Sequence, residues 1–128
     1  MKVEPFIHRP LVTVGPQHSV ADAARKMNER KVGSAVVLTE NGEPAIITER
    51  DVIRAVADGA DLDSAAVAEY MTSNAVCASS SWDVTLAVRT MIERGFRHLI
   101  VVGDGGEVVG VLSIRDLVSP LLAERTTA

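Results

Sequence analysis

The residues best suited to chemistry form a pattern that occurs twice. Thr48-Glu49-Arg50-Asp51 and Ser113-Ile114-Arg115-Asp116 each place a hydroxyl three residues before a carboxylate, where a strand-like segment gives way to a helix-like one. One interpretation is a helix N-cap, in which the hydroxyl accepts from a backbone N–H and the acid complements the helix dipole. A carboxylate also accepts two hydrogen bonds at once, which suits the hydroxyls of a ribose, and free N–H groups favour a nearby phosphate. The two interpretations are compatible.

Two adjacent basic residues, Arg97 and His98, stand at the start of another strand-like segment. Side chains alternate along a strand, so only one of the two should face any given cleft. An Arg fork fits phosphate oxygens, and a His adds charge near neutral pH. The alternative is a solvated Arg beside a partly buried His.

The elements that position these residues are duplicated. Val20–Arg30 aligns with Val84–Arg94 at an offset of 91 − 27 = 64 residues. The offset becomes 116 − 51 = 65 at the two acidic positions, so one half is a residue longer. A colinear series of matches over half the chain indicates an internal duplication.

Each half is predicted to form β-α-β-β-α, which gives an α/β (α+β) fold class. Apolar residues recur at helical spacing in 20–30 and 84–94, with Ser19 and Asp83 placed as caps. β-branched runs and turn signals predict the strands, and further helices should begin near residues 49 and 114. The expected strands are 11–14, 34–38 and 45–48 in the first half, and 75–78, 98–102 and 108–113 in the second.

The domain division expected from the repeat is 6–60, a linker 61–72, a second domain 73–122 and a tail 123–128. Ser64 is placed to cap a short linker helix over 65–70. Each half has about 55 residues, which is marginal for independent stability, so we expect the halves to pack with pseudo-twofold symmetry.

Composition excludes several function classes. Of the 128 residues, 13 are basic and 17 acidic, giving 13 − 17 = −4, so general nucleic-acid binding is not expected. The single cysteine, Cys77, excludes an intrachain disulfide, and the scattered histidines give no metal-ligand spacing. No apolar run approaches the roughly 20 residues that cross a bilayer. We therefore expect a soluble, cytoplasmic protein without membrane contact, cofactor or metal.

The order and spacing of these motifs resemble a tandem pair of cystathionine β-synthase (CBS) domains, or Bateman module. The resemblance rests on 67–72 (VAEYMT), 96–102 (FRHLIVV) and 110–117 (GVLSIRDL), and it extends from about Phe6 to Leu122. It implies a stand-alone regulatory module that senses an adenosine-containing ligand, such as AMP, ADP, ATP, S-adenosylmethionine or NAD, in clefts between the two units. It also implies a disc-shaped homodimer and an effector protein that the sequence does not identify.

The resemblance assigns roles to residues of two sites. In the first, Asp116 binds ribose, Ser113 lies near ribose or phosphate, and the basic residues Arg97 and His98 meet phosphate. Arg115 is a further candidate for the phosphate, the alternative being a place on the helix surface. The adenine is expected between groups contributed partly by the other unit, namely Ile7, Val12, Gly33, Ser34 and Ala35.

The second site is expected to be weaker because Gly33 and Ser34 stand where the first has Arg97 and His98. Ala45 also replaces the glycine matched by Gly110. Its residues are Thr48, Asp51 and Arg50, with a lining of Met71, Thr72, Asn74, Ala75, Val76 and Phe96.

Two other function classes remain as alternatives. A structural dimerisation module would bind no small molecule, and its Asp residues would only cap helices. An enzyme would need an acid–base pair or an activated nucleophile, and the sequence offers neither at a useful spacing. The expectation is therefore a binding module that is not an enzyme.

Overall fold

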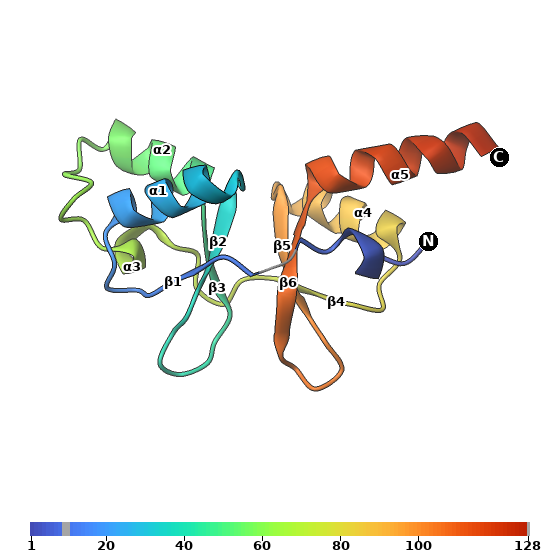
Figure 1. Cartoon of the computed structure of the whole chain (residues 1–128), viewed down its shortest axis with the longest axis horizontal. Helices are drawn as coiled ribbons and strands as arrows, with labels where there is room; N and C mark the ends of the chain where they lie inside the picture. Colours follow the sequence, from blue (N-terminus) through green and yellow to red (C-terminus); the bar gives the residue numbers. More distant parts are fainter. Residues whose placement is uncertain (9–10, 128) are drawn as a thin grey trace. The chain divides into compact units, whose positions relative to one another are not determined.

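The computed structural model describes residues 1–8 and 11–127 (Figure 1). It is a mixed α+β structure, as the sequence predicts. In chain order the elements are η1 (Glu4–Phe6), β1 (Thr13–Val14), α1 (Val20–Arg30), β2 (Ser34–Val37), β3 (Ala45–Thr48), α2 (Glu49–Ala57), α3 (Val67–Tyr70), β4 (Cys77–Ser79), α4 (Val84–Arg94), β5 (His98–Val102), β6 (Val108–Ser113) and α5 (Ile114–Thr127).

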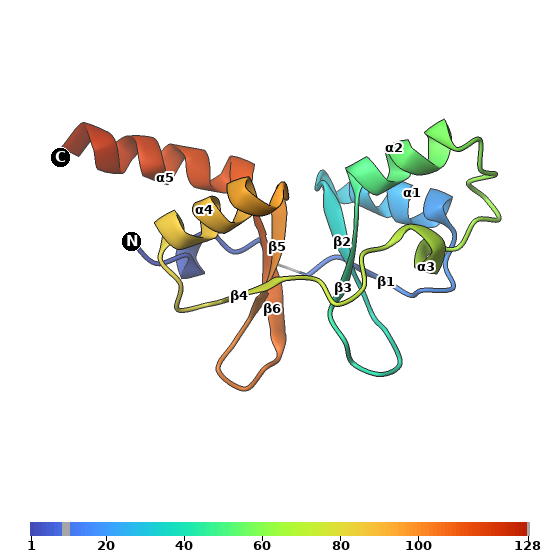
Figure 2. The same cartoon turned by 180° about the vertical axis from the view of Figure 1, so that it is seen from behind.

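The described chain divides into two compact units. The first-repeat unit comprises residues 11–75, and the second-repeat unit comprises residues 76–127 together with residues 1–8. Each contains a three-stranded sheet, in the order β1-β2-β3 or β4-β5-β6, with one parallel and one antiparallel pairing. In the first-repeat unit, α1 and α2 lie on the same face of the sheet, as both views show (Figures 1 and 2).

The first helix of each unit forms where its cap and apolar stripe predict. Ser19 and Asp22 make a reciprocal capping box at the start of α1, and Asp83 accepts a hydrogen bond from the Thr85 N–H at the start of α4. The buried positions of α1 are Val20, Ala23 and Met27, and those of α4 are Val84, Ala87 and Met91. Both predicted caps are confirmed.

Each unit has its own apolar core beneath its helices. Alternate residues of the central strands point into it: Ala35 and Val37 of β2, and Leu99 and Val101 of β5. Full burial of one such Val or Leu side chain contributes about 1.5–3 kcal/mol to folding. The cores therefore hold the strand-to-helix junctions in place.

The extra residue of the second repeat is accommodated as a β-bulge. Strands β2 and β3 pair regularly, from Ser34 opposite Thr48 to Val37 opposite Ala45. Between β5 and β6 the register shifts between Val101 and Val102, which pair with Gly110 and Val108 and leave Val109 unpaired. The change of offset from 64 to 65 is thus absorbed in the hairpin, and the junction after β6 keeps its geometry.

The segment at the start of each repeat packs into the compact unit that holds most of the other repeat. Val3 is fully buried in the second-repeat core, and the His8 N–H donates to the Val111 carbonyl of β6 at 2.8 Å. Val67, at an offset of 67 − 3 = 64, is fully buried in the first-repeat core, and the Ile46 N–H donates to the Thr72 carbonyl at 3.1 Å. Each compact unit is therefore built from residues of both repeats.

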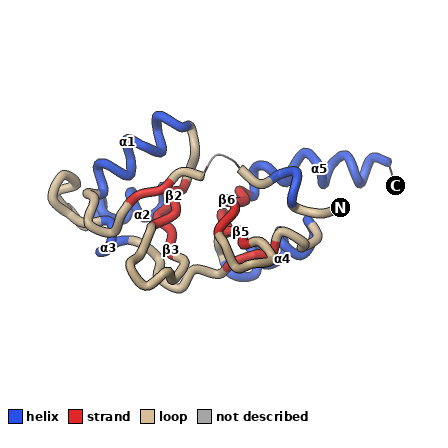
Figure 3. Tube along the Cα trace, turned by 60° about the horizontal axis from the view of Figure 1, so that its bottom comes forward, coloured by secondary structure: helices blue, strands red, loops and turns tan. Residues whose placement is uncertain are grey.

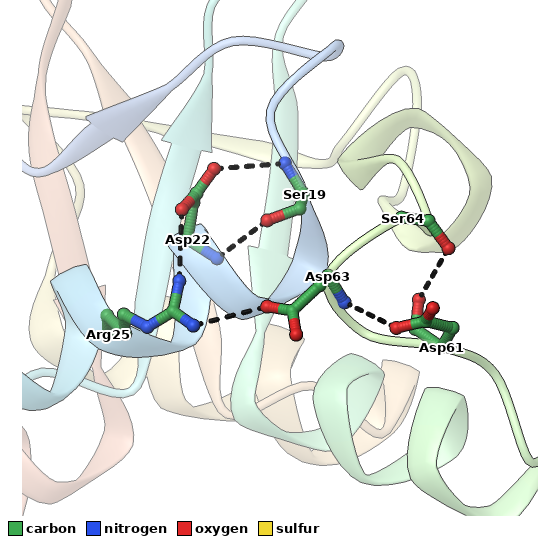
Figure 4. A network of polar contacts seen from close by, with 6 residues as sticks. All are labelled: Ser19, Asp22, Arg25, Asp61, Asp63 and Ser64. Atoms are coloured by element: carbon green, nitrogen blue, oxygen red, sulfur yellow. Dashed lines mark hydrogen bonds and ion pairs between the residues drawn. The ribbon is translucent and has the colours of Figure 1, made fainter.

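A polar network holds the connecting segment on α1. Arg25 lies between two carboxylates, 3.2 Å from Asp22 Oδ1 and 3.2 Å from Asp63 Oδ1 (Figure 4). The predicted Ser64 cap is wrong: Ala66 precedes α3, and Ser64 Oγ donates to the Asp61 carbonyl because the chain turns before the helix begins.

At the C-terminal end, α5 follows directly from β6 (Figure 3) and continues through Thr127, so residues 123–127 of the expected tail are helical. Residue 128 of that tail lies outside the described residues.

Candidate ligand site

The second-repeat junction gathers the basic residues and the hydroxyl predicted for it. His98 pairs directly with Ser113 across β5 and β6, and the Ile114 N–H donates to the Arg97 carbonyl at 2.9 Å. Arg97 is exposed and His98 is half-buried, as alternation along the strand predicts. These contacts bring Arg97, His98 and Ser113 to the end of the sheet where α5 begins.

Asp116 lies in the first turn of α5 with an exposed side chain. Ser113 Oγ accepts from the Arg115 N–H at 3.3 Å, so the hydroxyl caps the helix without using the acid. Across the residues that the structure describes, no hydrogen bond or ion pair engages the Asp116 carboxylate. Its oxygens therefore remain available to a donor from outside the unit.

The first-repeat junction has the same backbone geometry. Ser34 pairs with Thr48 across β2 and β3, and the Glu49 N–H donates to the Gly33 carbonyl at 2.9 Å. Arg50 lies exposed in the first turn of α2. The two junctions therefore share the same backbone hydrogen bonds and strand pairing, and they differ in their side chains.

Asp51 is engaged within its own unit and only 6% exposed. Its Oδ2 accepts from the Thr48 N–H at 2.9 Å and from the Thr48 hydroxyl at 3.1 Å, while its own N–H donates to Thr48 Oγ1 at 3.4 Å. Its Oδ1 lies 3.5 Å from Arg54 Nη2. The helix-cap interpretation holds here in full.

Arg54 connects Asp51 to α3. Its Nη2 donates to the Tyr70 carbonyl at 2.9 Å, and its guanidinium lies 5.6 Å from the centre of the Tyr70 ring. The Tyr70 hydroxyl donates to Asp58 Oδ2 at 3.1 Å. Burial, followed by this bond to Asp58, raises the pKa of Tyr70. Sequence reasoning missed this network, although an Arg three residues after an Asp in a helix is a recognisable signal.

Several residues expected to line a site belong to the cores. Ile7 was expected from the first repeat, yet it is buried in the second-repeat unit, the unit of Asp116, because the N-terminal segment packs there. Val12 and Ala35 are buried in the first-repeat core. Met71, Thr72, Asn74 and Ala75 lie in the first-repeat unit with Asp51, whereas Val76 and Phe96 pack on the second-repeat core.

Three further features of the described chain bear on metal binding, thiol reactivity and membrane-spanning helices. Residues 1–8 and 11–127 contain no group of three or more His, Cys, Asp or Glu that could hold a metal ion. Burial raises the pKa of the Cys77 thiol, which disfavours the reactive thiolate. No helix in the described part of the chain is long and apolar enough to span a membrane.

The start of α4 gives a prediction about pH. A hydrogen bond from the Met1 ammonium at 2.7 Å, followed by the Thr85 N–H, lowers the pKa of Asp83 from its ordinary 3.8 to about 2. Because this pKa is lower in the folded chain, the ionised Asp83 carboxylate stabilises the folded state. This contribution to the free energy of unfolding is complete above pH 3.8 and is lost as the pH falls through about 2.

The expected measurement is an NMR titration in which the Asp83 carboxyl has its midpoint near 2. The stability difference between the wild type and Asp83→Asn should shrink over the same acid range. A midpoint at the ordinary value of 3.8 would contradict this account.

The chain matches the CBS domain model twice, over residues 3–58 and 67–123. The fold and the duplicated junction thus define a tandem CBS pair, and the chain belongs to the CBS domain family.

Similar proteins include an uncharacterized 17.7 kDa protein of Acidianus ambivalens, 38% identical over 126 residues, which cover 98% of this chain and 76% of that protein. A CBS domain protein of Pyrobaculum aerophilum complexed with AMP is similar in structure, with a TM-score of 0.87, 32% identity and 100% of both chains covered. A signal-transduction protein with CBS domains from Burkholderia ambifaria, described as putative, has a TM-score of 0.87 and 30% identity, with 96% of this chain and 95% of that chain covered.

Proposed function

We propose that this protein is a regulatory module that binds an adenosine-containing nucleotide, with AMP as the first candidate. Asp116 accepts from the ribose hydroxyls, and Ser113 lies near the ribose or phosphate. Arg97 and Arg115 supply positive charge for the phosphate, and His98, the neighbour of Arg97 on the other side of the strand, is the alternative to Arg97.

The observation that carries the proposal is the exposed Asp116 carboxylate, which no group in the described chain engages. A ribose diol offers two donors to one carboxylate, and the backbone N–H groups at the start of α5 favour an anion. Two exposed guanidiniums, those of Arg97 and Arg115, belong to segments that the hydrogen bond from the Ile114 N–H to the Arg97 carbonyl joins. The similar protein of Pyrobaculum aerophilum, complexed with AMP, supports the choice of nucleotide.

Calorimetric and thermal-shift titrations with AMP, ADP, ATP, S-adenosylmethionine and NAD test the proposal. A ligand present at 100 times its dissociation constant should raise the free energy of unfolding by about 2.7 kcal/mol. The matched control is adenine without ribose or phosphate, which should give a much smaller shift. No shift with any of the five compounds at millimolar concentration would reject nucleotide binding.

A structural dimerisation module is the second candidate. It is favoured by apolar side chains that the helices leave exposed, an arrangement typical of interaction surfaces when such side chains are contiguous. They are Ile53 and Val56 on α2, Leu86 and Ile92 on α4, and Val118 and Leu122 on α5. A homodimer is compatible with nucleotide sensing, but a dimeric mass by light scattering together with a flat titration would favour this candidate alone.

A further inference from the structure

The two junctions differ in how their acids are engaged, and this difference bears on the number of ligands. Asp51 Oδ2 already accepts two hydrogen bonds from Thr48, and Asp51 Oδ1 faces the Arg54 guanidinium. A carboxylate has about four lone-pair sites. A ribose diol needs two of them, so it would have to displace Arg54.

Arg54 is itself held against displacement. The Tyr70 carbonyl and ring both contact its guanidinium, and Asp58 fixes the Tyr70 hydroxyl. Moving Arg54 away would break these contacts and leave the Asp51 carboxylate, only 6% exposed, without its cation. The Arg54 side chain is 56% exposed, so the ion pair by itself stabilises only modestly, and the contacts with Tyr70 add to what holds Arg54 in place.

The second repeat contains none of these partners for its acid. The counterparts at offsets of 64 or 65 are Asp116 for Asp51, Ser119 for Arg54, Phe6 for Tyr70 and Ala123 for Asp58. Serine is too short and carries no charge to neutralise a carboxylate one helical turn away, and phenylalanine has no hydroxyl. The side chains that engage Asp51, directly or through Arg54, therefore occur only in the first repeat.

We propose that Arg54 closes the first-repeat junction to nucleotide by occupying the Asp51 carboxylate, so that each chain binds one nucleotide, at Asp116. The inference rests on the proposed function, because it takes nucleotide as the ligand of an open junction. Arg54 acts here as a specificity-determining residue that sets the stoichiometry.

The test is the stoichiometry of AMP binding by calorimetry. The wild type should bind one AMP per chain, and Arg54→Ser, which copies the second repeat, should bind two. Adding Asp51→Asn to Arg54→Ser should return the value to one. Arg30→Ser removes the same charge from an exposed position in the same unit and should leave one site, which separates the specific contact from net charge.

A reciprocal variant keeps the proposal testable if Arg54→Ser fails to fold. Ser119 is exposed on α5, one turn from Asp116, so Ser119→Arg adds a guanidinium beside the open acid. It should weaken AMP binding at least about tenfold, which corresponds to about 1.4 kcal/mol.

The outcomes separate the two proposals. One AMP in both the wild type and Arg54→Ser, or two in the wild type, overturns the role of Arg54 and leaves nucleotide binding intact. No AMP in the wild type but one in Arg54→Ser overturns binding at Asp116 and supports the role of Arg54. No AMP in either protein overturns both.

Discussion

Asp116→Asn is expected to weaken AMP binding about 100-fold, or about 2.7 kcal/mol. The variant keeps the size of the side chain and removes its charge, so both ribose hydroxyls lose a charged acceptor. A hydrogen bond to a charged group contributes about 1.5–3 kcal/mol, roughly twice that of a neutral pair. Because Asp116 is exposed and makes no hydrogen bond or ion pair within the described residues, the folded chain should tolerate the change.

Calorimetry gives the affinity of this variant, and urea unfolding gives its stability. Glu93→Gln is the matched control, since it removes one negative charge from an exposed position on α4 of the same unit. If Asp116 only caps α5, the result is reversed: the variant loses stability and its AMP affinity matches that of the wild type.

Gly110→Ala is expected to lower the free energy of unfolding by about 3 kcal/mol, the upper end of the usual cost of overpacking. A Cβ at this position would lie 2.8 Å from the His8 carbonyl oxygen and would also meet the Ile7 side chain. A backbone carbonyl cannot rotate away as a side chain can. The N-terminal segment, which pairs with β6 through His8 and Val111, would have to move.

Urea unfolding measures the loss, and amide exchange at His8 reports on the segment itself. The first repeat supplies the control, because Ala45 occupies the position equivalent to Gly110 and its Cβ is fully buried in the core. Ala45→Gly should cost about 1–2 kcal/mol, from backbone entropy and the loss of one buried methyl group. A Gly110→Ala variant as stable as the wild type, with unchanged exchange at His8, would contradict the close packing described for this strand.

Much of the fold follows from local patterns in the chain. The apolar stripe of Val20, Ala23 and Met27 predicts α1, and Ser19 marks its start, because capping and amphipathic burial act over a few residues. The repeat then carries the same elements into the second half. The duplicated Ser/Thr-x-x-Asp pattern predicts where both strand-to-helix junctions lie, because a helix cap depends only on residues close together in the sequence.

The functional difference between the junctions required contacts between residues distant in the sequence. Tyr70 follows Arg54 by 16 residues, and the spacing of residues does not reveal which side chains a turn of the chain brings together. The same reason explains the place of Val3 and Ile7, which stand at the start of the first repeat and belong to the second-repeat core.

By itself, the sequence determined the duplication, the helices and strands and the two acidic positions, because periodicity and capping depend on near neighbours. Only the tertiary structure decided which segment completes each core and which acid is left open. Both depend on packing between side chains that lie far apart along the chain.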